Sequence, residues 1–338
     1  MAFLMLKTLP MSLPSIQNMA KPGEKPAKRK AVTDVVALVA GHDGVPAVRV
    51  RKAKDGTLEI TAAAVLDLPG ELPDSPEAAE ADLTRWSLPR AFQAARAAIA
   101  VASPQGSLRF TEEVPDADAV IRCASVKTEG DLPSLVASLP EYQAAWTARL
   151  FPEGRRPTAC SIQLASSAAL NVLLAAGGKQ NVVAFLASPS STALVGLQGG
   201  KPVFYREYGE GQKDIRAALM SNMRIDEEMA ESILNDAMVD PTPVIEPILR
   251  PLFRQAEIAG DYLMRRGNAG VDRFVVVGLK SGLRYWSSIF ELMTGQVLTE
   301  ITPDAGLRWG CRKPDTEKAG LSVFTAAFGA ARAVLEEA

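Results

Sequence analysis

The sequence predicts an α/β protein built from two related halves. Residues 182–208 hold three strand-like runs of β-branched and aromatic residues, separated by a polar turn and by a turn at Gly199 and Gly200. The same strand–turn–strand–turn–strand order occurs about half a chain earlier, over 35–66, where Asp55 and Gly56 give a hairpin signal. A repeat at this separation indicates two related units, and helical patterns follow each of them.

Length and composition set the class of protein. The chain has 338 residues, of which 47% are apolar and 22% charged, with a net charge of -2. This length accommodates two domains with separate cores, and the charge balance gives no general attraction to nucleic acid. We therefore expect a flexible basic tail at 1–30, a first domain at 31–175 and a second at 176–338.

Two further patterns concern the location of the protein. No apolar run approaches the roughly 20 residues that a bilayer requires, and Lys7 and Pro10 interrupt the short apolar start. Cys123, Cys160 and Cys311 are too widely spaced for a metal cluster or a disulfide framework, so we expect buried free thiols. Both patterns predict a protein of a reducing, cytoplasmic compartment.

The tail at 1–30 has two interpretations. It contains four prolines and a basic patch, which is typical of a flexible leader. Alternatively, its apolar part docks on a protein while its basic part meets an anionic membrane surface.

The remainder of the first half is predicted element by element. Residues 35–39, 47–52 and 58–66 are the three strands of the repeat, and the alanine-rich segment 78–102 is expected to be mostly helical, interrupted at Pro89. Between 106 and 164 we expect strands at 108–110, 119–126 and 159–164. Helices are expected there at 133–139, with Pro133 in the first turn, and at 141–150.

The second half has clearer helical signals. One helix is expected at 213–223, and another begins at Asp226, whose acidic neighbours suit the positive end of a helix, and runs to about 236. Residues 244–266 show the clearest apolar spacing; Pro247 falls in the tolerated first turn, whereas Pro251 is expected to bend the helix. The remaining elements are a strand at 272–277, a helix at 285–294, a short strand at 298–301 and a closing helix at 322–337.

Several short motifs in the second half carry a specific resemblance. They are Gly200-Lys201-Pro202 and Arg206-Glu207 in the hairpin, Ile245-Glu246-Pro247 at the start of the long helix, Asp272-Arg273-Phe274-Val275 in a strand, and the alanine-rich stretch 324–331. With these motifs the chain resembles the PilM family of type IV pilus assembly, with a wider kinship to FtsA, the actin-like division protein. The resemblance implies an actin-like, ribonuclease-H-type ATPase fold, with a mixed five-stranded sheet and flanking helices in each domain. Residues from about 71 to 156, where relatives hold an inserted subdomain, match poorly.

The departures from the family concern its nucleotide site. In the family, two strands carry Asp-x-Gly, whose acid handles Mg²⁺ and whose glycine lets backbone N–H groups approach phosphate. Here the first strand ends without an acid and the second ends in Phe185 and Ala187; the small-residue adenosine loop is also altered. We therefore expect no Mg-ATP binding, no cofactor and no metal. The degenerate nucleotide-site positions are Val39, Gly41, Phe185, Ala187, Thr192, Gly278, Leu279 and Lys280.

Several other residues have a purely structural interpretation beside a functional one. His42 next to Asp43 is more often a solvated turn residue than a catalytic base, and no Ser/His/Asp or Cys/His set forms around it. Lys280 is a phosphate ligand on one interpretation and a surface lysine on the other. The polar turn at 188–192 binds an anion or simply caps two strands. Residues 177–179 and 199–201 lack the spacing of a phosphate-binding P-loop and are interpreted as turns.

The functional prediction follows from the resemblance. The chain is expected to be a non-catalytic cytoplasmic adaptor, peripheral on the inner membrane, that binds the N-terminal cytoplasmic peptide of a PilN-like membrane protein in a groove of the first domain. A PilO-like protein and the assembly motor are further expected partners, and nucleic acid is not. The alternative is an actin-like ATPase of pilus, type II secretion or cell-division machinery with a non-standard nucleotide site.

Overall fold

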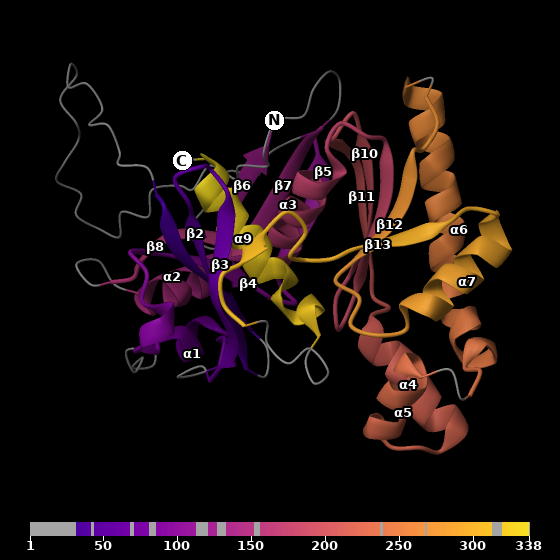
Figure 1. The fold of residues 1–338 in the computed structure, drawn as a ribbon, viewed down its shortest axis with the longest axis horizontal. Helices are drawn as coiled ribbons and strands as arrows, with labels where there is room; N and C mark the ends of the chain where they lie inside the picture. Colours follow the sequence, from indigo (N-terminus) through magenta and orange to yellow (C-terminus); the bar gives the residue numbers. More distant parts are fainter. Residues whose placement is uncertain are drawn as a thin grey trace.

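Two large sheets stand side by side in the computed structural model of this chain (Figure 1). The structure describes residues 32–41, 44–67, 71–80, 86–112, 121–126, 133–151, 156–236, 239–267, 269–312 and 320–337, with the backbone alone at 121–126 and 337. The expected tail at 1–30 and the pair His42 and Asp43 lie outside these residues.

The first sheet has the strand order β14-β3-β2-β1-β4-β8. β1 (Asp34–Ala40), β2 (Val45–Lys52) and β3 (Leu58–Leu66) form an antiparallel meander, and β4 (Arg96–Val101) and β8 (Thr158–Leu164) extend it in parallel on the other side of β1. The two-residue strand β14 (Arg308–Trp309) adds a sixth member at the edge beside β3. β1 is buried along almost its whole length: β2 and β4 pair with its two edges, and helix α9 (Thr325–Glu337) packs on one of its faces.

The second sheet repeats this topology. β9 (Val182–Ala187), β10 (Thr192–Gln198) and β11 (Lys201–Tyr208) form the meander, and β12 (Arg273–Val277) and β13 (Leu298–Ile301) run parallel to β9. The strand order is β11-β10-β9-β12-β13, which matches the order β3-β2-β1-β4-β8 in the other sheet. The repeat predicted from the sequence is therefore confirmed.

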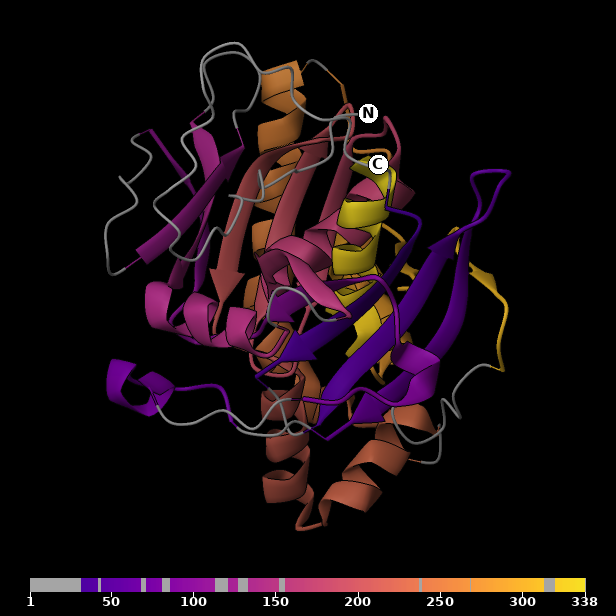
Figure 2. The ribbon, with the colours of Figure 1, turned by 90° about the vertical axis from the view of Figure 1, so that its left-hand side faces the viewer.

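Two helices fill the space between the sheets (Figures 1 and 2). α3 (Ala165–Gly177) and α9 (Thr325–Glu337) cross where an ideal Cβ on Gly329 would lie 1.7 Å from the carbonyl oxygen of Ala168, so only glycine permits this approach. The core around them combines residues of both sheets. α9 follows the short 3-10 turn η2 (Leu321–Phe324) and packs on β1, β2 and β4. The last part of the chain thus lies with the first sheet, while the expected division at 175/176 stays a prediction.

A buried ion pair anchors α9. Arg332, 5% exposed, pairs with Glu336 at 3.0 Å and also donates to the carbonyl of Ala305, in the segment between β13 and β14. Burial lowers the pKa of Arg332 and raises that of Glu336, although each group supports the charged form of the other. Lys52 adds a bond from β2 to the carbonyl of Leu335 at 3.0 Å.

The outer face of the second sheet is covered by α6 (Thr242–Gly267) and α7 (Leu283–Thr294), and α4 (Gln212–Met223) and α5 (Glu227–Asn235) form a further pair of helices beyond it (Figure 1). Asp226 accepts a bond from the N–H of Met229 and so caps α5, as predicted. Among the described residues, no helix is long and apolar enough to cross a membrane.

A small sheet lies beside the two large ones. Its order is β5-β7-β6, with β5 (Ser107–Thr111), β6 (Ile121–Val126) and β7 (Ser134–Pro140), and β7 leads into α2 (Glu141–Arg149). The expected strands at 108–110 and 119–126 and the helix at 141–150 are largely confirmed. β5 also contacts β11, the edge strand of the second sheet.

Two expected helices are wrong. Residues 133–139 form strand β7, because Leu135, Ala137 and Leu139 alternate into the core while the backbone pairs with β5 and β6. Residues 78–102 are not mostly helical: they hold the end of α1 (Pro76–Glu80), the 3-10 turn η1 (Arg90–Phe92) and β4. β4 lies between β1 and β8 with both faces buried, so its alanines serve close packing and override helix propensity.

The cysteines are less buried than expected. Cys160 and Cys311 are partly exposed, and burial raises the pKa of the Cys311 thiol. The side chain of Cys123 lies outside the described residues.

Candidate functional site

The expected nucleotide site lies at the carboxyl ends of β1, β9 and β12. The ends of β9 and β12 lie at one edge of the second sheet and the end of β1 lies in the first sheet; ligands of α/β folds bind outside the carboxyl ends of parallel strands. The three connections there are the turn that begins at Gly41, the turn at 188–191 and the loop at 278–282.

The turn after β1 packs closely against the end of the neighbouring strand β4. Gly41 has φ +108°, and a Cβ there would lie 2.4 Å from the carbonyl oxygen of Ala102 and 3.3 Å from the side chain of Leu72. The N–H of Ala102 donates to Ala40 at 2.8 Å. Val39 is 2% exposed and belongs to the core. Glycine at 41 is therefore required by close approach to the end of β4.

Near the end of β9, the side chain of Phe185 packs between the second sheet and helices α6 and α7. Phe185 is fully buried and meets the rings of Phe253, Trp286 and Phe290 edge-on at 5.5, 5.8 and 6.0 Å. Ala187 belongs to the same outer cluster, whereas Leu186 faces the helices between the sheets. A carboxylate at 185 would be buried among aromatic rings, at a cost of several kcal/mol on general grounds.

The turn at 188–191 is closed by its own hydrogen bonds. The N–H of Ser188 donates to the carbonyl of Ser191 at 2.9 Å, and the N–H of Ser191 donates to the hydroxyl of Ser188 at 3.0 Å. The hydroxyl of Ser191 also donates to Glu207 at 2.7 Å. Thr192, the first residue of β10, is 2% exposed. The structure thus favours the capping interpretation of this polar turn.

The amino end of α4 covers the same turn. The N–H groups of Gln212 and Lys213 donate to the carbonyls of Ser188 and Pro189 at 3.1 and 2.9 Å. Gly211 makes this contact possible, because a Cβ there would lie 2.5–2.6 Å from backbone atoms of residues 189–191. A helix amino end is an anion site when its N–H groups are free, and here two of them bond to the turn.

The loop after β12 is held by one glutamine. The Gln212 side chain donates to the carbonyl of Gly278 at 2.9 Å and accepts from the N–H of Lys280 at 2.7 Å. Gly278 has φ +81°, and a Cβ there would lie 2.6 Å from the carbonyl oxygen of Ala187. Leu279 is buried at 6% exposure in the outer cluster. The backbone that would accept a nucleoside is therefore bonded to α4.

Lys280 faces a charged cavity between α4 and α5. Its Nζ lies 3.4 Å from Glu231, and Arg216 pairs with Glu227 at 2.7 Å. The other Glu231 oxygen is buried without a hydrogen bond, 3.7 Å from Arg216. The cavity measures about 540 Å³ and is lined by Arg216, Glu227, Glu228, Glu231, Ser232 and Lys280. Among the described residues, no cluster of three or more His, Cys, Asp or Glu suits a metal ion.

Comparisons with known proteins bear on the fold. No family model matches the chain, and no curated protein matches it. A solved PilM-PilN type IV pilus biogenesis complex matches with a TM-score of 0.59 and 17% identity, covering 89% of this chain and 98% of that chain.

The chain has an actin-like ATPase fold. A Bacteroides thetaiotaomicron protein with an actin-like ATPase fold and unknown function gives a TM-score of 0.44 at 8% identity, covering 80% of this chain and 92% of its own. Ta0583, an archaeal actin homolog, gives 0.43 at 13% identity, covering 90% of this chain and 100% of its own.

Within the actin-like fold, the structure brings part of the expected site together. Ala187, Gly278 and the turn at 188–191 meet around the amino end of α4, while Gly41 packs separately against the end of β4. Sequence reasoning missed Gln212 and Gly211, which close these loops. It also missed the charged cavity, because Arg216 and Glu227 come from different helices and have no spacing signature.

Proposed function

We propose that this actin-like chain is a non-catalytic adaptor of a type IV pilus assembly machine, and that it binds the N-terminal cytoplasmic peptide of a PilN-like inner-membrane protein. The observation that carries the proposal is the hydrogen bonding of the turn at 188–191 and the loop at 278–280, each of which is bonded to the amino end of α4. A further support is the likeness of fold to the chain in the PilM-PilN complex.

The bonding pattern argues against an ATPase on chemical grounds. Phosphate recognition needs N–H groups that point at the ligand, and Mg²⁺ needs an oxygen-rich site. In this chain, N–H groups of Ser188, Ser191 and Lys280 bond to the protein, and Phe185 stands where the resemblance to the PilM family implies an acid. To bind Mg-ATP, the turn would have to break several of these bonds. An adaptor can keep the two-sheet framework without an open phosphate-binding site.

The small sheet is the part of the fold that we propose for peptide capture. β5 and β6 are its edge strands, and β5 also contacts β11. An edge strand presents unpaired N–H and C=O groups, so an extended peptide gains affinity by adding a strand and by burying alternate side chains. An apolar peptide with a Leu-Pro element suits this mode. The adaptor would then sit on the inner face of the membrane that holds its partner.

Peptide binding tests the proposal directly. The full chain is titrated into a fluorescent N-terminal peptide of a PilN-like inner-membrane protein from the same organism, and anisotropy should rise to saturation. The matched control is the same peptide with its apolar residues replaced by Asp, which should not bind. If neither this peptide nor the intact partner binds saturably, the adaptor function is wrong; binding of the intact partner alone removes only the peptide mode.

One observation favours the alternative of an ATPase with a non-standard site. The charged cavity adjoins the loop at 278–280, and Glu231 and Lys280 are groups that can bond to ribose hydroxyls. The charges there already pair with one another, which weakens this alternative. Nucleotide titration separates the two functions.

A further inference from the structure

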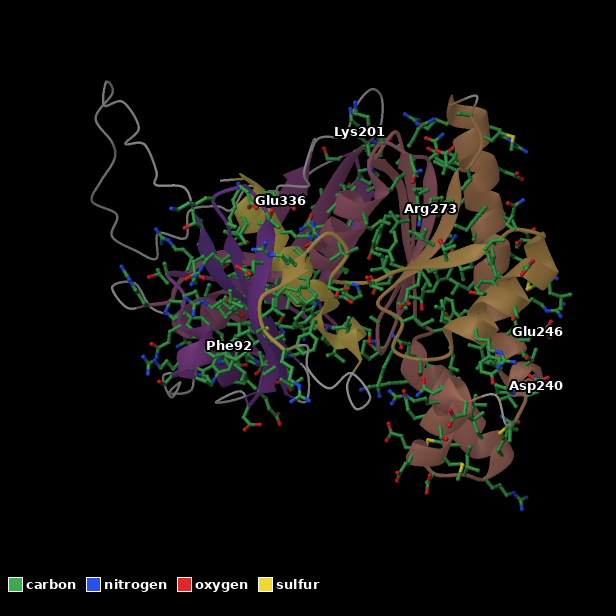
Figure 3. All side chains as sticks on the ribbon, in the orientation of Figure 1. Phe92, Lys201, Asp240, Glu246, Arg273 and Glu336 are labelled. Atoms are coloured by element: carbon green, nitrogen blue, oxygen red, sulfur yellow. The ribbon has the colours of Figure 1, made fainter. Side chains whose placement is uncertain are left out.

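The long helix α6 presents an unusual solvent face along its whole length. Glu246, near its amino end, projects at the outer flank of the molecule (Figures 1 and 3). Apolar residues recur on this face at steps of four and seven, which keeps them in one row. The members of this apolar row, all exposed, are Pro243, Pro247, Pro251, Ile258 and Tyr262.

The two ends of the apolar row differ in shape. The prolines line a shallow groove of about 590 Å³, together with Glu246, Arg250, Arg254 and Gln255. Ile258 and Tyr262 project from the other half of the helix, with 58% and 38% of their surfaces exposed. The amino-terminal half of α6 therefore borders the groove, and the carboxyl-terminal half carries exposed large side chains.

A charged row runs beside the apolar one. Its six members, at steps of three and four, are Glu246, Arg250, Arg254, Glu257, Asp261 and Arg265. Arg250 pairs with Glu246 one turn away. Within the described part of the chain, no ion pair involves Arg254, Glu257, Asp261 or Arg265. From the amino end, the first three charges are negative, positive and positive. From the carboxyl end backwards, the first three are positive, negative and negative, so each charge in one half corresponds to an opposite charge in the other.

We propose that α6 pairs antiparallel with α6 of a second copy of this chain, about a twofold axis level with residues 255 and 256. In this register Arg254 faces the partner's Glu257, Arg250 faces the partner's Asp261 and Glu246 faces the partner's Arg265. Each pair occurs twice because a twofold interface is isologous.

The same register places the exposed apolar residues over the groove. Ile258 of one copy comes opposite Pro251 of the other, and Tyr262 comes opposite Pro247, within a turn of the charge pairing. Proline rings give these residues a flat apolar contact. Prolines at 247 and 251 also leave the carbonyls four residues earlier without their usual helical donor, and the Tyr262 hydroxyl can donate to such a group.

The charge pattern selects a second copy over other occupants. A partner of one sign would meet like charges on half of this face, which disfavours a uniformly acidic or basic peptide. A single helix offers less than the roughly 800 Å² per partner of a standard interface, so the dimer is weak. Its contacts are largely exposed ion pairs, so it weakens with salt.

Sedimentation velocity of the full chain at rising concentration tests the pairing. The wild type should show a monomer–dimer equilibrium in the high micromolar range, weakened about tenfold between low and high salt. Arg254→Glu and Glu257→Arg should each be monomeric, because each places like charges opposite each other twice. Mixing these two variants should restore a dimer, as should the double variant Arg254→Glu/Glu257→Arg.

The matched control is Lys54→Glu, a reversal of an exposed charge in the β2–β3 hairpin of the first sheet, which should dimerise like the wild type. Thermal unfolding checks that each variant is folded, and peptide binding should be unchanged in all of them, which separates this proposal from the adaptor function. A wild type that stays monomeric at every concentration overturns the proposal. So does a dimer that survives Arg254→Glu, or variants that fail to associate when mixed.

Discussion

Gly211 has an ordinary φ, so its importance is not visible in its backbone conformation. It matters because α4 begins against the turn at 188–191, where a Cβ would lie 2.5 Å from the N–H nitrogen of Ser191. Gly209, two residues earlier, has no atom within 4 Å of an added Cβ. Substitutions at the two positions therefore distinguish two effects: both reduce chain flexibility, but only the one at Gly211 disturbs close packing.

Gly211→Ala should destabilise the protein by about 1–3 kcal/mol, because α4 must move away from the turn and its bonds to Ser188 and Pro189 lengthen. Gly209→Ala should change stability by no more than about 0.5 kcal/mol. Urea unfolding of both variants gives the difference. Equal stability of the two would mean that α4 does not close the turn.

For single residues, the sequence showed which positions depart from the nucleotide-site motifs of the PilM family, but not what the side chains at those positions contact. The absence of an acid at 185 is visible in the chain, and so is the altered loop at 278–280. That Phe185 points into the outer aromatic cluster follows from strand pairing. The bonds of Gln212 to Gly278 and Lys280 join residues about 66 apart in the chain, and no local pattern encodes such contacts.

Helices α3 and α9 decide how closely the two sheets approach. Their crossing at Ala168 and Gly329 uses small residues on both sides. α9 was predicted from its alanine-rich pattern, whereas α3 had no counterpart among the expected elements. α3 is buried on most sides, polar Ser167 and Asn171 included, so it lacks the apolar stripe that marks a surface helix. β4 and β7 were misassigned for a different reason: their pairing within the sheets overrides local propensity.

Gly329→Ala should cost about 2 kcal/mol or more, since the added methyl group would overlap the backbone of α3 and force the helices apart. The matched control is Gly260→Ala in α6, where the nearest neighbour of a Cβ is a side-chain atom of Val271 at 3.4 Å. That variant should be neutral or gain up to about 1 kcal/mol from helix propensity. Calorimetric melting compares them; a Gly329→Ala protein as stable as the wild type would contradict the close crossing.

For the molecule as a whole, the repeated hairpins predicted the fold because each strand of a meander is local and its turns carry glycine signals. The small sheet was predicted only in part, because its helical assignment at 133–139 rested on one proline. Both sheets and the helices between them form a framework in which the nucleotide loops are bonded to the protein itself. We therefore expect that the chain does not bind Mg-ATP.

Isothermal titration of Mg-ATP into the full chain tests this expectation. A cooperative thermal unfolding transition of the same sample serves as the check on folding. We expect no saturable heat up to millimolar nucleotide, because the turn at 188–191 and the loop at 278–280 would have to give up their bonds to α4. Saturable binding with a micromolar dissociation constant would show that these loops open for nucleotide, and would favour an ATPase with a non-standard site.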